Sequence, residues 1–131
     1  MSAPAGLNPA QVMRHRPPAL LLGRVVDSTT AGLVCAGIDD GPWRWARLLE
    51  GAAQTAGLFS GLQPGGPGAD AVIAEYRDVT LHAALYFGRV RFHAALDRRI
   101  LGFWRCRVEA RSEGGRLLLA GLVAVAPGAG P

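Results

Sequence analysis

The sequence contains no lysine, only two cysteines and only three histidines in 131 residues. Cys35 and Cys106 lie far apart in apolar segments, and neither belongs to a CxxC or a cysteine–histidine motif. This excludes the zinc sites and redox pairs that depend on such spacing. We therefore expect two buried free thiols, and we predict neither a metal site nor a cofactor.

All fourteen basic residues are arginines, and the formal net charge is +4. A nucleic-acid-binding protein would need a basic stripe with stacking aromatics in a recognisable module. The arginines at 89–111 instead alternate with apolar residues, which is typical of the solvent-facing side of a sheet. We predict no nucleic-acid partner, although a basic surface favours an acidic one.

Neither a signal peptide nor a transmembrane helix is indicated by the sequence. Residues 1–18 lack a basic start followed by an apolar core, and the apolar core within 117–131 is too short to span a bilayer. We therefore predict a cytoplasmic protein without membrane contact. The length fits one domain, expected at 14–127, between an N-terminal arm at 1–13 and a tail at 128–131.

One long apolar segment, WRWARLLEGAAQTAGLFSGL at residues 43–62, has no charged residue after Glu50. This pattern is typical of a helix enclosed on all sides. Asp39, Asp40 and Pro42 just before it are typical of a helix start, and the QPGGPG loop after it ends the helix. We predict a single long buried helix.

The rest of the chain predicts antiparallel strands, with a hairpin before the helix and four strands after it. Their predicted ranges are 19–27, 33–38, 71–81, 87–97, 100–111 and 116–126. The imperfect alternation in the first strand after the helix indicates either two covered faces or a bulge. Together, the predicted helix and strands indicate an α+β fold, in which a long central helix is wrapped by an antiparallel sheet of five to six strands. Dimerisation would cover the open edges of such a sheet.

Two motifs carry a resemblance to a known family. Residues 15–25 read HRPPALLLGRV and residues 49–57 read LEGAAQTAG. They resemble the HRxPxLLLDRV opening and the central-helix EAxAQxxG motif of the hotdog-fold 3-hydroxyacyl-ACP dehydratases, of the FabZ type and its divergent ApeP-like branch. Residues 76–79 and 87–92 also lie where that family has a strand and a PGD-type turn, so the resemblance extends from residue 14 to 126.

The resemblance implies a hotdog fold and chemistry on acyl thioesters. In the family, a helix carboxylate works across the dimer interface with a histidine from a His-Phe-Pro-Gly loop before the helix. Glu50 matches the carboxylate, but residues 39–45 replace that loop and contain no histidine. His15 resembles a structural position of the family, and His82 and His93 are expected at the surface, so none of them is predicted to replace the missing histidine.

Dehydration of a 3-hydroxyacyl thioester needs a base for the α-proton, an acid for the departing hydroxyl, and donors for the thioester oxygen. Glu50 is the candidate acid, or else it pairs with Arg47 one turn earlier. Gln54 would orient Glu50, bind substrate, or tie the helix to a strand backbone. Asp40 is a candidate base, although Asp39 and Asp40 equally fit a helix cap.

Trp43, Trp45 and Gly57 are candidate substrate-binding residues. The two indoles would line an acyl or pantetheine tunnel, or would pack in an interface. The leading hypothesis is a 3-hydroxyacyl-ACP dehydratase homologue in fatty-acid or polyketide biosynthesis that lacks the usual loop histidine.

Two alternatives remain open. One is an acyl-CoA or acyl-ACP thioesterase, in which the same carboxylate activates water. The other is a non-catalytic subunit that binds acyl carrier protein or forms a heterodimer with an active dehydratase. The expected partners are therefore an acyl thioester on acyl carrier protein or CoA, and a second chain in a homodimer or such a heterodimer.

Overall fold

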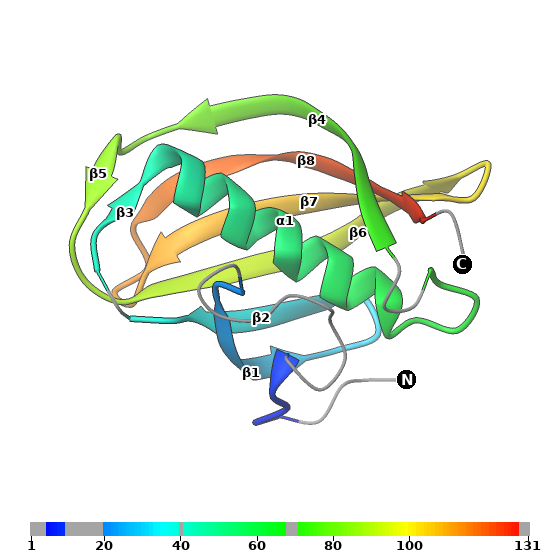
Figure 1. Ribbon diagram of the computed structural model, residues 1–131, viewed down its shortest axis with the longest axis horizontal. Coiled ribbons are helices and arrows are strands. Elements are labelled where there is room, and N and C mark those ends of the chain that lie inside the picture. The colour runs from blue at the N-terminus through cyan, green and yellow to red at the C-terminus, as the bar shows by residue number, and fades with distance from the viewer. Residues whose placement is uncertain (1–4, 10–19, 40, 68–70, 129–131) are drawn as a thin grey trace.

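The computed structural model describes residues 5–9, 20–39, 41–67 and 71–128. The elements in chain order are β1 (Leu22–Ser28), β2 (Gly32–Gly37), β3 (Trp43–Arg44), α1 (Trp45–Gly61), β4 (Ala71–Leu81), β5 (Leu85–Tyr86), β6 (Val90–Ile100), β7 (Phe103–Ser112) and β8 (Leu117–Pro127). Helix α1 lies across one face of the main sheet, and β4 arches along one edge of that sheet (Figure 1). The predicted α+β fold is confirmed.

The main sheet has six strands in the order β1-β2-β6-β7-β8-β4, and every neighbouring pair is antiparallel. The short strands β3 and β5 form a separate pair. The predicted alternation in β6 and β7 is confirmed, because Phe92, Ala94, Cys106 and Val108 are buried. His93 and Arg107, the residues between them, stay accessible. One face of the sheet therefore packs on α1, and the other faces away from it.

Strand β4 is irregular, as its imperfect alternation indicated. Its register with β8 shifts between Ile73 and Glu75 and again between Arg77 and Thr80. Asp78 lies within the second irregularity and has a φ of 54°, which a non-glycine residue rarely adopts. The predicted bulge is therefore confirmed.

The helix begins at Trp45 and not at Trp43 as predicted, because Trp43 and Arg44 form β3. The predicted acidic cap is also wrong. The N-cap residue is Arg44, no side chain caps the helix, and its first turn contains no acidic residue. Of the two acids expected to cap it, Asp40 lies outside the described residues.

Burial of the Trp43 indole explains the later helix start. Trp43 is fully buried, its ring meets the Phe92 ring edge-on at a centroid distance of 5.4 Å, and the Arg47 guanidinium lies 4.0 Å from its centroid. Burying an indole contributes more free energy than a helix cap does, so this packing and the β3–β5 pairing keep the backbone extended. At its other end the helix finishes at Gly61, with Leu62 as the C-cap.

Both cysteines are free and buried, as predicted. Burial raises the pKa of the Cys35 thiol to about 12, although a hydrogen bond with Thr55 acts in the opposite direction. Burial and the charge of Asp97 raise the pKa of the Cys106 thiol to about 12 as well. Both thiols are therefore protonated at neutral pH and lack the thiolate that a nucleophile requires.

Within the described chain, no helix is long and apolar enough to cross a membrane.

Two glycines of α1 have opposite surroundings. A Cβ atom at Gly51 would overlap the Phe92 ring of β6, whereas a Cβ atom at Gly57 would meet no atom within 4 Å. Gly51 therefore lets the helix approach the sheet closely, and Gly57 faces open space.

We expect Gly51→Ala to destabilise the fold by about 1–3 kcal/mol, because overpacking outweighs the gain in helix propensity. Gly57→Ala should instead stabilise it by up to about 1 kcal/mol, since the propensity gain is unopposed. Urea unfolding followed by circular dichroism measures both variants. Equal effects of the two substitutions would contradict the close contact between α1 and β6.

Candidate functional site

Glu50 and Gln54 lie one turn apart on α1 and contact each other. Gln54 Nε2 donates a hydrogen bond of 3.3 Å to Glu50 Oε1, and Gln54 Oε1 accepts one of 2.8 Å from the backbone N–H of Leu21. Gln54 is only 3% exposed, whereas Glu50 is exposed. The buried amide therefore connects the backbone before β1 to an exposed carboxylate, which combines two of the roles expected for Gln54.

Arg47 is engaged with backbone atoms and not with Glu50. Its guanidinium donates hydrogen bonds of 3.4 and 3.3 Å to the carbonyl oxygens of Gly41 and Pro42. In the part of the chain that the structure describes, the alternative ion pair between Arg47 and Glu50 is not formed. Glu50 is exposed in the single chain, so its carboxylate is open to solvent on the helix surface.

Tyr76 of β4 is the polar side chain that sequence reasoning missed near this carboxylate. It pairs in register with Val123 of β8, which is fully buried, so both side chains project toward the face that α1 covers. Burial raises the pKa of the Tyr76 phenol, and the charge of Glu50 raises it further. The sequence did not predict this orientation, because each bulge in β4 changes which alternate residues point to the helix side of the sheet.

The three predicted substrate-binding residues have different surroundings. Trp45 at the start of α1 is 55% exposed, and Gly57 faces open space along the helix. Trp43 packs in the core, and among the described residues its Nε1 has no hydrogen-bond partner. Its complete burial argues against the substrate contact predicted for Trp43, whereas the other two positions are accessible.

The described histidines do not take the place of the missing loop histidine. His82 is exposed, as expected, and follows β4. His93 is half-buried, less solvated than expected, and burial lowers its pKa although the Glu109 charge opposes the shift. It points away from α1, because its neighbour Phe92 packs on the helix side. His15 lies outside the described residues.

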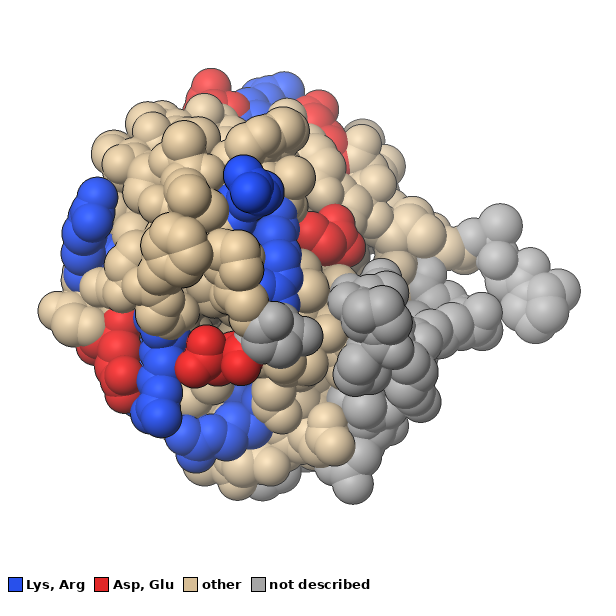
Figure 2. All heavy atoms as spheres, turned by 60° about the vertical axis from the view of Figure 1, so that its left-hand side comes forward, with Lys and Arg blue, Asp and Glu red and all other residues tan. Residues whose placement is uncertain are grey.

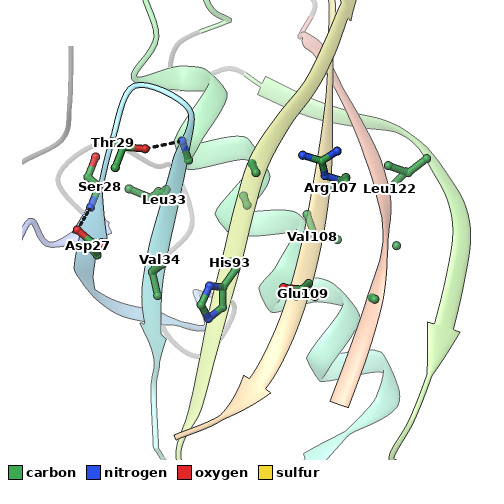
Figure 3. A pocket seen from close by; sticks show the side chains of 15 residues that line it. Asp27, Ser28, Thr29, Leu33, Val34, His93, Arg107, Val108, Glu109 and Leu122 are labelled. Carbon is green, nitrogen blue, oxygen red and sulfur yellow. Dashed lines mark hydrogen bonds between the residues drawn. The ribbon is translucent and has the colours of Figure 1, made fainter. Parts of the chain in front are cut away.

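A groove of about 580 Å³ occupies the sheet face opposite α1, and His93 lines it between Val34 and Glu109 (Figure 3). None of the predicted site residues lines this groove. The groove is therefore separate from the Glu50 site. No set of three or more histidine, cysteine, aspartate or glutamate side chains in the described ranges is placed to hold a metal ion.

An apolar strip, defined as the exposed large aliphatic and aromatic side chains of β4, β5 and their flanks, borders the candidate site. It comprises Val72, Tyr76, Val79, Leu81, Leu85 and Phe87. Figure 2 brings the side with β3 and β5 forward and shows a broad uncharged surface bordered by arginine side chains. So much exposed apolar surface is typical of an interaction site.

The two edges of the sheet differ. The outer edge of β1 is covered, because Gly6 N–H donates to Val25 O at 2.7 Å and Val25 N–H donates to Leu7 O at 2.9 Å. Strand β4 pairs with β8 on one side only, and no described strand pairs with its other side. The open edge of β4 is thus next to the apolar strip.

No family model and no curated protein matches the sequence. Solved structures are similar to it, among them the dehydratase heterocomplex ApeI:P from Xenorhabdus doucetiae, with a TM-score of 0.80, 17% identity, and coverage of 94% of this chain and 92% of that chain. The chain has the hotdog fold.

Two other hotdog neighbours are named as thioesterases. One, from Haemophilus influenzae, has a TM-score of 0.64 and 12% identity and covers 78% of this chain and 75% of its own. The other is a hypothetical thioesterase protein with coenzyme A from Streptococcus pneumoniae, with a TM-score of 0.60, 12% identity, and coverage of 77% and 81%. The structural similarity shows the hotdog fold that the family resemblance implied, whereas membership of the FabZ-type family remains a prediction.

Substitution of Gln54 tests its anchoring role. We expect Gln54→Met to lower the free energy of unfolding by about 1–3 kcal/mol, because the buried N–H of Leu21 loses its acceptor. The same change at Gln63, in the loop after α1, should stay within about 0.5 kcal/mol. Urea unfolding compares the two variants, and equal stabilities would contradict the anchoring role.

Proposed function

We propose that this chain processes acyl thioesters, as a homologue of the 3-hydroxyacyl-ACP dehydratases, with Glu50 as the proton-transfer group. The observation that carries the proposal is the exposed carboxylate of Glu50, held by the anchored amide of Gln54, on the central helix of a hotdog fold. The dehydratase and thioesterase neighbours support chemistry on thioesters, without deciding between the two reactions.

The arrangement leaves one carboxylate oxygen available for substrate. Gln54 occupies Glu50 Oε1, and no described residue bonds to Oε2. Gly57, one turn beyond Gln54, leaves open space along the same side of the helix, where an acyl chain or a pantetheine arm would lie. In this proposal Gly57 and Trp45 contact the substrate, while Glu50 Oε2 exchanges protons with it.

A second chain would complete this site. The open edge of β4 and the apolar strip provide a pairing surface beside the helix, and a chain docked on it would exclude water from Glu50. Asp40 lies outside the described residues and stays a candidate base from sequence alone. We propose a homodimer, in which each copy covers the other copy's site.

A heterodimer is the second candidate assembly. The absence of a histidine in residues 39–45 and the similarity to a chain of a dehydratase heterocomplex both favour a subunit that works with an active dehydratase. In that case activity would require the partner, and this chain would supply the acyl-carrier-protein surface or the Glu50 side of a shared site.

The activity test uses 3-hydroxyacyl-ACP and acyl-CoA as substrates, with mass spectrometry for loss of water and a thiol assay for hydrolysis. We expect dehydration, reduced at least about 100-fold in Glu50→Gln. The control Glu113→Gln, in the β7–β8 turn, should retain the parental rate. Thiol release dependent on Glu50 would instead indicate a thioesterase. Turnover equal in the two variants, or none on either substrate, would remove the enzymatic proposal for this chain alone.

The assembly test adds a charge to the apolar strip. We expect Leu81→Arg to convert a dimer into a monomer, because a buried guanidinium at an apolar interface has no partner. Thr30→Arg, in the exposed β1–β2 turn, adds the same charge away from β4 and should leave the dimer intact. Light scattering after gel filtration measures the mass. A monomeric parent protein, or a Leu81→Arg variant that stays dimeric, would count against pairing through β4.

A further inference from the structure

Tyr76 is distinct among the β4 residues that project toward the helix side. Ile73, Tyr76 and Leu81 lie opposite Val125, Val123 and Leu119 of β8, which are all buried. Side chains directly opposite each other in an antiparallel pair point to the same face. Of these three β4 side chains, Tyr76 alone has a hydrogen-bonding group, and it is 42% exposed. A partly exposed phenol is therefore placed on the helix side of β4.

The charged side chains next to Tyr76 in sequence belong to the other face. Glu75 lies opposite Ala124, and its carboxylate accepts from Arg77 Nε at 2.9 Å. Both residues line a groove on the face away from α1. The described charge that acts on Tyr76 is that of Glu50 on α1. The phenol therefore lies on the side of β4 that faces α1, whereas Glu75 and Arg77 lie on the other side.

The state of this phenol follows from its surroundings. Burial and the Glu50 charge both raise the pKa of Tyr76 above its ordinary value, so the hydroxyl keeps its proton at neutral pH. A neutral phenol donates a hydrogen bond, whereas a carboxylate only accepts. Glu50 and Tyr76 thus offer an acceptor and a donor from two different elements, α1 and β4.

We propose that Tyr76 is a catalytic residue of this site, and that its phenol donates a hydrogen bond to the 3-hydroxyl oxygen of a 3-hydroxyacyl thioester bound beside Glu50. This proposal rests on the proposed function. The phenol orients the departing oxygen and stabilises the charge that develops on it when the C3–O bond breaks. It thereby takes over the positioning that a second polar group would otherwise supply.

The atoms balance without a further reactant. Glu50 Oε2 takes the proton from C2, the C2–H electron pair forms the C2–C3 double bond, and the C3–O bond breaks. The departing hydroxide takes the proton from Glu50 and leaves as water, which restores the carboxylate. Tyr76 keeps its own proton throughout, so the phenol is a donor and not the general acid.

The first test measures the contact between Tyr76 and Glu50 without any substrate. The chain has two tyrosines, so a Tyr86→Phe background leaves Tyr76 as the single phenol whose ionisation is followed by ultraviolet absorbance. Glu50→Gln should lower the pKa of Tyr76, because removal of a nearby negative charge favours the phenolate. Glu75→Gln, next in sequence but on the other face, should change it less. An unchanged titration in Glu50→Gln would overturn the proposal.

The second test measures turnover of 3-hydroxyacyl-ACP. Tyr76→Phe should lower kcat/KM by about 100-fold with an unchanged thermal unfolding midpoint, whereas Tyr86→Phe should retain the parental rate. Turnover that depends on Glu50 but is equal in Tyr76→Phe and the parent would overturn the role of Tyr76 and leave the proposed function intact. A titration that responds to Glu50, combined with no turnover of any acyl thioester, would overturn both.

Discussion

The hydrogen bond between the Leu21 N–H and the buried Gln54 amide connects the fold to the candidate site. Because its oxygen is held at 2.8 Å by the backbone before β1, the orientation of the amide is set, and its NH₂ group is directed to Glu50. Without the hydrogen bond to Leu21, the amide could turn either its oxygen or its NH₂ group toward Glu50. One interaction therefore anchors the helix to the backbone that leads into β1 and positions the exposed carboxylate.

The architecture could be predicted from the sequence because, for most strands, the alternation of apolar residues and the turn residues at the strand ends indicate the same element. The range of β4 was predicted as it is observed, and alternation assigned the faces of β6 and β7 correctly. The start of α1 was not predictable in the same way. Asp39 and Pro42 have the local chemistry of a helix start, but burial of the Trp43 indole depends on Phe92, which lies far away in sequence.

The candidate site was predictable in part for the same reason. Glu50 and Gln54 are one helical turn apart, so their contact follows from local geometry. Tyr76 lies between the two register shifts of β4, and its pairing with Val123 places it on the helix side of the sheet. The alternation of apolar and polar residues cannot locate either shift, so it did not predict this orientation. The loss of alternation that made β4 ambiguous in sequence thus coincides with the strand that brings a phenol toward the helix.

If chains pair through the open edge of β4 as proposed, the covering of β1 by residues 6–7 limits how many of them can assemble. A sheet with two bare edges can add neighbours at both sides and grow into an open filament. A sheet with one bare edge forms a self-complementary pair by two-fold symmetry, after which no edge remains for a third chain. In the proposed pairing, a few backbone hydrogen bonds at the sheet edge opposite β4 would therefore block polymerisation.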